Sequence, residues 1–497
     1  MSNPRKIERV LLIFPPMIDH AYLEKHCVVP SGIAALAAWV RPDYEVKLLD
    51  CIVEGYHQVR NRGQMLVEYG LDDDSVRRQI VEFNPDVVGV SCLFSSQFGA
   101  VRRFTKIAKE INPEVVTVTG GTHPSFLSEK CLNSAPDLDF IVIGEGELTF
   151  KDLLDSLRDG KDYRDLDGLA FREDGKIRVN EKKRLIENLD DLPLPARDLL
   201  PIEKYFKYAV PMAHYHKSRR NISIATSRGC PFRCTFCSSC QHWRGYRTRS
   251  VEHVLAEMDV LKNQYGVEEL KFEDDNITAD KKRARALFQG MIDRGYNFKW
   301  NTPNGIAVWT IDDELLDLMK RSGAFELTLA IETGNQWVMD NIIKKPLKLD
   351  KVVPAAEAVR RHGMDVYAYV IIGFPGETRE QIQDTFDLLK KARIYKFAPF
   401  LYTPLPGSGL YYKCLEMGLI DENYDFETFN VYYKAPFDRP GLTQKELMDW
   451  AYREYRNASI RFFLREPIHF IRRHWFALQS WDRIFNKVVN FVRWKFE

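Results

Sequence analysis

The chain has 497 residues, of which 45% are hydrophobic and 28% charged. This length is too great for one compact core, so we expect two or three domains of an ordinary globular protein. The 71 Lys and Arg residues balance the 70 Asp and Glu residues, which excludes a partner such as nucleic acid recruited by overall charge.

The distribution of cysteines and of apolar residues along the chain indicates the cellular compartment and the relation to membranes. Four of the nine cysteines lie within residues 230–240, and this clustering favours metal binding in a reducing compartment, the cytoplasm, over a disulfide framework. No apolar run reaches about 18 residues, so we expect no membrane-spanning helix.

The first 150 residues alternate short apolar strands with helices. This pattern predicts a parallel, doubly wound (Rossmann-like) sheet, which binds ligands at the carboxyl ends of its strands. Glycines at these ends, at 120–121 and 144–146, favour a large, flat ligand. The expected elements are strands Val10–Phe14, Val46–Asp50, Asp86–Cys92, Val115–Thr119 and Phe140–Ile143, with helices Ser31–Val40 and Gln97–Ile111.

A connector is expected over residues 168–220. It begins with a polar hairpin over 168–179 and continues through an extended, proline-fixed stretch over 191–198.

The alternation then starts again with a strand at Ile222–Thr226. Six strand–helix units predict a partial parallel (β/α)6 barrel with its site at the carboxyl edge. Helical sequence follows from Gln444 to the end. The remaining units are strands Glu269–Glu273, Phe298–Ile306, Glu326–Ile331, Asp365–Ile372 and Phe397–Tyr402, with helices Val251–Gln264, Lys281–Arg294, Asp312–Ser322, Lys351–Arg361 and Arg379–Ala392.

Three closely spaced cysteines directly follow the first barrel strand. Cys230, Cys234 and Cys237 have the spacing C-x3-C-x2-C, which suits three corners of an iron–sulfur cluster and leaves one iron open for chemistry. The spacing alone also allows a structural zinc site completed by Cys240.

The run from Arg228 to Cys237, opening a strand–helix barrel, resembles the radical S-adenosylmethionine (SAM) superfamily. The resemblance implies a [4Fe-4S] cluster whose open iron is chelated by the methionine part of SAM. One electron, from a donor such as flavodoxin or ferredoxin, then cleaves SAM to a 5′-deoxyadenosyl radical. Cys240 becomes a bystander, because a fourth protein ligand would fill the open position.

Later strand ends match other SAM-binding segments of this superfamily. Asp274, Asp275 and Asn276 stand where many relatives carry Gly-Gly-Glu, and they are expected to hold the amino group of SAM. Glu332 is expected at the ribose. The positions that resemble the adenine contacts are Phe236, Gly373 and Phe374.

The N-terminal half resembles the cobalamin-binding domain fused to many radical SAM enzymes. The Asp-x-His-x-x-Gly motif of other cobalamin domains is missing, since Ile52 occupies the histidine position of the similar run 50–55. Cobalamin is therefore expected without a lower histidine ligand, and His123 is the nearest candidate for one. The residues expected to contact cobalamin are Pro15, Ser91, Gly120, Gly121, Thr122, Gly144, Glu145 and Gly146.

The tail over 467–497 carries aromatic and apolar residues at helical spacing, including Ile471, Trp475 and Trp481, among several arginines. Such a helix lies in a lipid headgroup layer or packs on the barrel, and the sequence leaves both open. An interfacial helix implies peripheral contact with the inner face of a membrane and a lipid-like substrate.

The predicted organisation is a cobalamin-binding domain (1–167), a linker (168–220), a radical SAM barrel (221–410) and a helical region (411–497). The resemblance favours methylation of an unactivated carbon on a hydrophobic small molecule. Ring formation or rearrangement, as in the anaerobic cyclase of chlorophyll biosynthesis, stays open. Two further alternatives are a methylthiotransferase with a second cluster on Cys27, Cys51 and Cys92, and a non-catalytic metal or cobalamin carrier.

Overall fold

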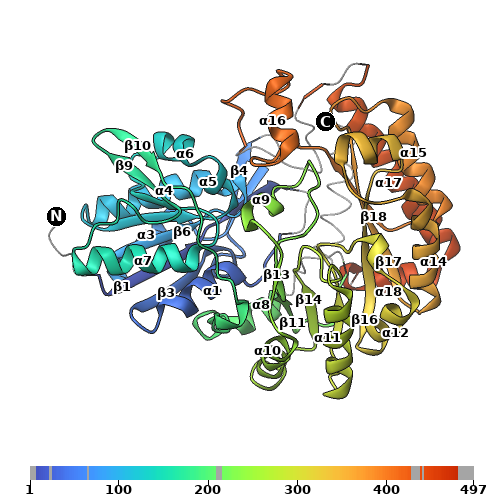
Figure 1. Cartoon of the computed structure of the whole chain (residues 1–497), viewed down its shortest axis with the longest axis horizontal. Helices are drawn as coiled ribbons and strands as arrows, with labels where there is room; N and C mark the ends of the chain where they lie inside the picture. Colours follow the sequence, from blue (N-terminus) through green and yellow to red (C-terminus); the bar gives the residue numbers. More distant parts are fainter. Residues whose placement is uncertain are drawn as a thin grey trace.

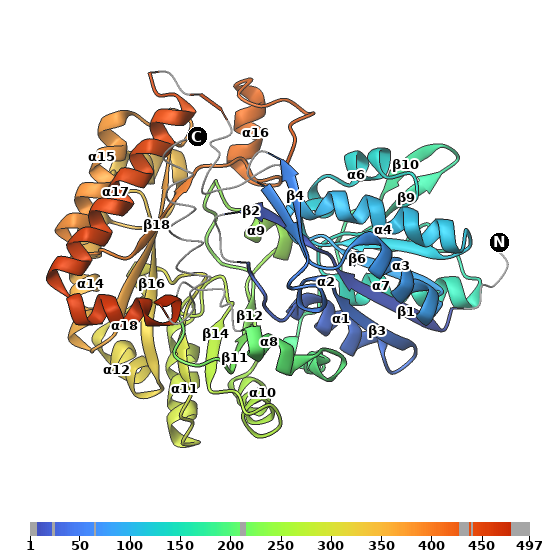
Figure 2. The ribbon, with the colours of Figure 1, turned by 180° about the vertical axis from the view of Figure 1, so that it is seen from behind.

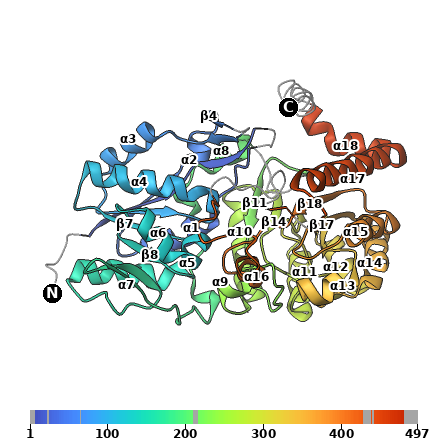
Figure 3. The same ribbon diagram turned by 90° about the horizontal axis from the view of Figure 1, so that it is seen from above.

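The protein is described by a computed structural model. It describes residues 7–21, 25–63, 66–208, 215–426, 437–438 and 441–478, with side chains up to residue 473. Two α/β units stand side by side, with the cysteine segment at their junction (Figures 1 and 3).

The N-terminal sheet has seven strands in the order β10-β9-β8-β7-β6-β1-β3. The five strands from β8 to the edge strand β3 are parallel, which confirms the doubly wound α/β fold. The hairpin at the start of the predicted linker pairs with β8 in antiparallel fashion, so it belongs to this sheet. The strands are β1 (Arg9–Phe14), β3 (Glu45–Asp50), β6 (Val87–Ser91), β7 (Val116–Gly120), β8 (Phe140–Val142), β9 (Leu169–Glu173) and β10 (Lys176–Val179).

Alternation along β1 explains the two layers of helices on this sheet. Val10 and Leu12 point into the core shared with α1 (Ser31–Val40) and α7 (Gly146–Asp159). Leu11 and Ile13 point into the opposite core, shared with α3 (Asp73–Phe83) and α4 (Phe98–Ile111). Both faces are apolar because the sheet is covered on both sides.

A small antiparallel sheet, in the order β2-β5-β4, escaped sequence prediction. It comprises β2 (Met17–His20), β4 (Val59–Gly63) and β5 (Leu66–Tyr69), and β4 is mostly exposed and shows no apolar alternation. Ion pairs hold it together: Glu68, which is buried, binds Arg60 at 3.2 Å and Arg103 at 2.5 Å. Strand β4 lies toward the junction of the two units (Figure 2).

The second unit is an open parallel sheet of six strands in chain order, which confirms the partial barrel. Three helices of this unit begin after a residue whose side chain caps the first turn. They are α10 (Val251–Asn263) after Ser250, α11 (Lys281–Asp293) after Asp280 and α12 (Asp313–Arg321) after Asp312. The other helices are α14 (Val352–Arg361) and α15 (Arg379–Lys391). The strands are β11 (Asn221–Ile224), β14 (Glu269–Phe272), β15 (Lys299–Asn301), β16 (Ala324–Glu332), β17 (Asp365–Ile372) and β18 (Phe397–Leu401).

Strand β15 is shorter than predicted. It ends at Asn301, and residues 302–306 continue as a turn with a single bridge from Ile306 to Leu329. Pro303 cannot donate a ladder hydrogen bond, and Gly305 adopts φ = 87°, so the chain bends here despite its apolar pattern.

The C-terminal region comprises α16 (Gly409–Glu416), α17 (Gln444–Arg465) and α18 (Pro467–Leu478). The start of α18 packs on the amino ends of the barrel strands: Arg473 pairs with Glu326, and His469 lies 2.9 Å from Asp365. Ile468 and Ile471 remain 67% and 44% exposed. The rest of the predicted interfacial tail, 479–497, lies outside the described residues.

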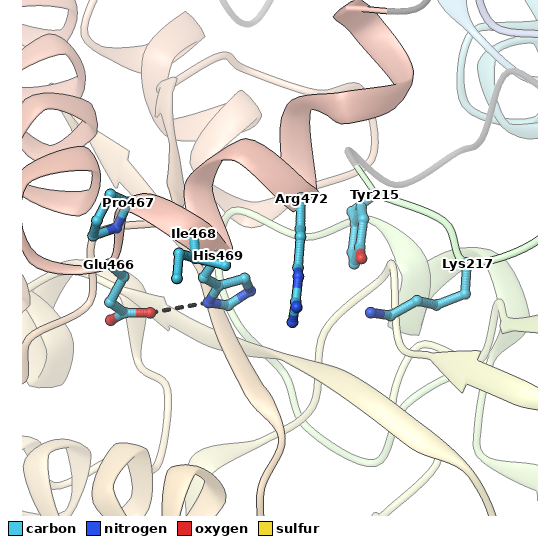
Figure 4. Close-up of a pocket in the computed structure, with 7 residues that line it drawn as sticks. All are labelled: Tyr215, Lys217, Glu466, Pro467, Ile468, His469 and Arg472. Atoms are coloured by element: carbon cyan, nitrogen blue, oxygen red, sulfur yellow. Dashed lines mark hydrogen bonds and ion pairs between the residues drawn. The ribbon is translucent and has the colours of Figure 1, made fainter.

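A surface hollow of about 420 Å³ separates the start of α18 from Tyr215 and Lys217 (Figure 4). It opens at the amino ends of the barrel strands, whereas the cysteines follow the carboxyl end of β11. The hollow is therefore remote from the cysteines. Within the described residues, no helix is both long and apolar enough to cross a membrane.

Candidate active site

The cysteines lie on a hairpin with a short two-stranded stem. Its strands are β12 (Ser227–Arg228) and β13 (Arg247–Thr248), and α9 (Ser239–Trp243) lies between them. Gly229 closes the stem with φ = 77°, and a Cβ atom there would lie 1.9 Å from the carbonyl oxygen of Gly245. Only glycine fits this position, so the loop from 229 to 246 is held closed at its base.

The three predicted ligands are partly buried, and their thiols influence one another. Burial raises the pKa of Cys234 to about 11 and that of Cys237 to about 12, and it also raises the pKa of Cys230. The ammonium group of Lys345 opposes this effect at Cys230 and Cys234. The free thiols are protonated at neutral pH, so a metal cluster must displace their protons when it binds.

The zinc alternative requires ligands that converge on one point about 2.3 Å from each sulfur. Among the residues that the structure describes, no three Cys, His, Asp or Glu side chains are so arranged. The structure therefore gives the zinc alternative no support, and a cluster, which binds its thiolates through separate iron atoms, does not need such a convergence.

The positions of Cys27, Cys51 and Cys92 do not support the second-cluster alternative. Cys27 lies in the core on one face of the N-terminal sheet, whereas Cys51 and Cys92 lie in the core on the other face. The three thiols pack in two different cores and are not gathered in one, so the methylthiotransferase alternative gains no support from them.

The two acids predicted to hold the amino group of SAM, Asp274 and Asp275 after β14, differ in their hydrogen-bond partners. The carboxylate of Asp274 is already occupied by protein groups. It accepts hydrogen bonds from the backbone N–H of Thr226 at 3.1 Å and from the Thr226 hydroxyl at 2.7 Å. Asp275 accepts a hydrogen bond from Ser239 and lies close enough to Cys230 and Cys237 to raise the pKa of both. Of the two acids, Asp275 is the one placed beside the cysteines.

Two buried amide groups stand at the carboxyl edge of the barrel without a hydrogen-bond partner. They are Nδ2 of Asn276, after β14, and Oδ1 of Asn301, at the end of β15. An unpaired buried polar group costs about 1–3 kcal/mol, which a polar ligand would recover. A donor and an acceptor at this edge fit the polar groups of SAM, and Asn301 escaped prediction because it lies inside an apolar strand pattern.

Glu332 ends β16 and is buried with Lys345, whose Nζ lies 2.7 Å from Oε1 of Glu332 and 2.7 Å from the carbonyl oxygen of Ala330. Lys345 follows a π-helical turn, Met339–Ile343, whose Ile343 carbonyl accepts the backbone N–H of Thr235 at 2.9 Å. The predicted ribose residue thus has a cationic partner next to the cysteine loop. Lys345 escaped prediction because the run Lys344-Lys-Pro346 looks like a solvated loop.

The predicted adenine contacts come together. The rings of Phe236 and Phe374 lie 6.1 Å apart between centroids. The backbone N–H groups of Gly373 and Phe374 donate to Oε2 of Glu377 at 2.6 and 3.0 Å, which fixes the turn after β17. Phe374 is fully buried, so of the two rings only the partly exposed one of Phe236 is free to contact a purine, and the adenine site stays a prediction.

Most predicted cobalamin contacts lie along one edge of the N-terminal sheet, at the ends of β1, β6, β7 and β8. Gly121 has φ = 117°, and a Cβ atom there would lie 2.4 Å from the carbonyl oxygen of Cys92. The fold itself therefore requires this glycine, whatever ligand binds. The members at this edge are Pro15, which is buried, and Ser91, Gly120, Gly121, Thr122, Gly144 and Gly146, which are partly exposed.

Glu145 has a different role from the predicted one. Its carboxylate is buried, and it pairs with Arg228 at 3.0 Å and with Arg247 at 2.7 Å, both on the cysteine hairpin. Sequence reasoning could not place these arginines next to it.

His123 is buried at the same edge, with Nδ1 2.9 Å from Oγ of Ser95. Burial and the nearby charge of Lys130 lower its pKa to about 4, so the imidazole is neutral. Its ring packs between Phe98 and Phe426, at 5.4 and 6.1 Å between centroids. Cobalamin binding without a histidine ligand stays a prediction.

Two family models match the chain. The B12 binding domain matches residues 25–154, and the radical SAM superfamily matches residues 224–389. Each matched range lies within one of the two α/β units, and the second includes the cysteine hairpin.

Named relatives extend the similarity to the whole chain. It is 34% identical to cytidylyl-2-hydroxyethylphosphonate methyltransferase of Streptomyces wedmorensis, over 96% of this chain and 94% of the relative. It is 30% identical to the anaerobic magnesium-protoporphyrin IX monomethyl ester cyclase of Rubrivivax gelatinosus, over 80% and 69%. The fold resembles that of the methyltransferase TsrM from Kitasatospora setae, with a TM-score of 0.66 and 16% identity over 84% and 80% of the two chains.

The chain therefore belongs to the cobalamin-binding radical SAM enzymes, whose named members among these relatives are methyltransferases and a cyclase. The radical SAM domain implies a [4Fe-4S] cluster and SAM, and the B12 binding domain implies cobalamin.

Proposed function

We propose that this enzyme is a C-methyltransferase that adds a methyl group to an unactivated carbon of a small molecule. The observation that carries the proposal is the end-to-end similarity to a methyltransferase, which covers 96% of this chain, against 80% for the cyclase. When bound, the cluster and SAM supply a radical that removes a hydrogen atom from the substrate, and cobalamin supplies the methyl group.

The roles of the chain's own residues follow from their positions. Cys230, Cys234 and Cys237 hold the cluster. Asn276 and Asn301 present unpaired amide groups to SAM, and Phe236, with the buried Phe374 behind it, lies beside its adenine. These residues bind and orient SAM, and the edge of the N-terminal sheet presents cobalamin from the other side.

Two classes of substrate are proposed for testing. A hydrophobic, lipid-like substrate is supported by exposed apolar side chains on α17 and α18, among them Leu464 and Ile468, 71% and 67% exposed. A nucleotide-linked phosphonate is supported by the name of the relative that matches end to end.

The test is a mass comparison with anaerobically reconstituted enzyme, a reductant and SAM labelled with deuterium in its methyl group. Lipid extracts and nucleotide-linked phosphonates are incubated separately. A product that gains a labelled methyl group supports methyl transfer and identifies the class. A product that only loses hydrogen contradicts methylation and supports ring formation or desaturation.

Membrane contact and electron supply are proposed separately. The exposed apolar residues near Arg465 and Arg472 support contact with anionic lipid. Flotation with anionic liposomes should recover the full chain but not a chain ending at residue 466, and equal recovery of both contradicts the contact. Reduced flavodoxin or ferredoxin should replace a chemical reductant in the assay above.

A further inference from the structure

Two acids of the N-terminal unit and two arginines of the cysteine hairpin form one buried ion network. Arg228 donates to Oε1 of Glu145 at 3.0 Å and to Oε1 of Glu147 at 2.5 Å. Arg247 binds Glu145 through both terminal nitrogens, at 2.7 and 3.0 Å. The four side chains are between 2% and 15% exposed. We call them the hairpin clamp.

The hairpin clamp binds the base of the loop that carries the three cluster cysteines. Arg228 and Arg247 are paired residues of the β12–β13 stem, and Arg228 precedes Cys230 by two positions. Gly229, between Arg228 and Cys230, packs its backbone closely against Gly245 across the stem. The position of Cys230 is therefore coupled to that of Arg228. A displacement of the arginines would therefore move the cysteines.

The acids come from the segment that borders the predicted cobalamin edge. Glu145 and Glu147 follow β8, and Glu145 stands between Gly144 and Gly146. Oε2 of Glu145 also accepts the backbone N–H of Ile186 at 3.1 Å, so the carboxylate itself is fixed.

We propose that Glu145 and Glu147 are positioning residues that set the place of the cluster hairpin relative to cobalamin. Two acids balance two arginines, so the network is neutral, and removal of one partner leaves a buried charge uncompensated. The two cofactors must face one cavity, and a clamp made of planar, bidentate Arg–carboxylate pairs fixes direction as well as distance. The inference rests on the cofactors of the family and not on the identity of the substrate.

The test compares Glu145→Gln, Glu147→Gln and the double variant with wild type, each reconstituted with cluster and cobalamin. Glu181→Gln is the matched control, because Glu181 also pairs with an arginine of the hairpin, Arg244, but at 3.4 Å and 66% exposed. Pulsed EPR measures the magnetic coupling between the reduced cluster and Co(II) of cobalamin. We expect full iron and cobalamin contents throughout, with a distance distribution that is broadened or shifted most in the double variant, less in the single variants and not at all in Glu181→Gln.

A second measurement covers the case in which a variant loses a cofactor. Hydrogen exchange of residues 227–249 in cofactor-free protein should be at least about tenfold faster in the double variant, with the cores of both units unchanged. Unchanged distance distribution and unchanged exchange would overturn the proposal. Failure of the wild type to bind cobalamin would instead count against the proposed function.

Discussion

Lys345 and Glu332 form a buried ion pair beside the cysteine loop, with 2.7 Å between Nζ and Oε1. The backbone on both sides is unusual. Glu332 adopts φ = 69°, and Lys344, which follows the π-helical turn, adopts φ = 55°. Such conformations cost about 1–3 kcal/mol in non-glycine residues and cluster at functional sites. Since Lys345 acts on the pKa of Cys230 and Cys234, its charge lies close to two of the three predicted cluster ligands.

Replacement of this pair should weaken SAM binding. In the double variant Lys345→Met/Glu332→Gln neither buried charge is left alone, so the fold should persist. The loss of charge-assisted hydrogen bonds worth about 1.5–3 kcal/mol should raise the Kd for SAM by about 10- to 100-fold. Equilibrium binding of SAM to the reconstituted protein measures this. The control is Lys348→Met, whose ammonium is exposed and lies 3.4 Å from Asp340. Equal affinity in the double variant and the control would contradict the assignment.

Cys240 should be dispensable for the cluster. It lies near the other thiols, since its charge influences the pKa of Cys230, Cys234 and Cys237. We expect Cys240→Ala to keep the iron content and the visible spectrum of the reconstituted protein, and Cys237→Ala to lose both. Iron and sulfide analysis decides. Loss of the cluster in Cys240→Ala would restore the reading of Cys240 as a ligand.

Gly229 should be essential to the hairpin for steric reasons. Alanine at this position would place Cβ 1.9 Å from a backbone oxygen, and neither strand of the stem can yield without displacing Cys230. Gly229→Ala should therefore fail to assemble the cluster while the cobalamin unit stays folded. Gly245→Ala is the matched control, because its φ is also positive, at 144°, but no atom lies within 4 Å of the added Cβ. Iron content and cobalamin binding are measured for both variants, and equal iron content would refute the steric argument.

The sequence predicted the elements whose patterns are local. Continuous apolar runs predicted the central strands of both sheets and placed the three cysteines after the first barrel strand, but they did not predict the β12–β13 stem. It did not predict β4, because that strand is held by Arg60 and Arg103 around Glu68 and not by an apolar face. It also treated residues 298–306 as one strand, since apolar periodicity does not show where Pro303 and Gly305 bend the chain.

Side-chain roles were harder to predict than positions. Asp274 and Glu145 stand at the expected strand ends, yet their carboxylates already bind Thr226 and Arg247 of the protein itself. Acids at a strand end look alike in sequence, and only tertiary structure shows which has a protein partner. The fold leaves Asp275 beside the cysteines and Nδ2 of Asn276 without a partner, and their role at the SAM site stays a prediction.

The attachment of α18 should weaken as pH rises. The hydrogen bond to Asp365 raises the pKa of His469, and a second one to Glu466 adds to this effect. Burial alone would raise the pKa of Asp365, but His469 and Lys396 lower it well below its usual range. A histidine whose pKa is raised in the folded state contributes stability that is complete below its unfolded pKa of about 6.5 and is lost as pH passes through the raised value. Asp365 stays ionised throughout this range.

Amide protection of residues 467–473 should therefore be lower at about pH 9 than at about pH 6, after correction for intrinsic exchange. The decrease should be partial, because the pair of Arg473 with Glu326 does not titrate in this window. His469→Gln should give the lower protection at both pH values, since the neutral amide cannot carry the charge. Protection that falls equally with pH in wild type and in His469→Gln would show that another group controls the docking of α18.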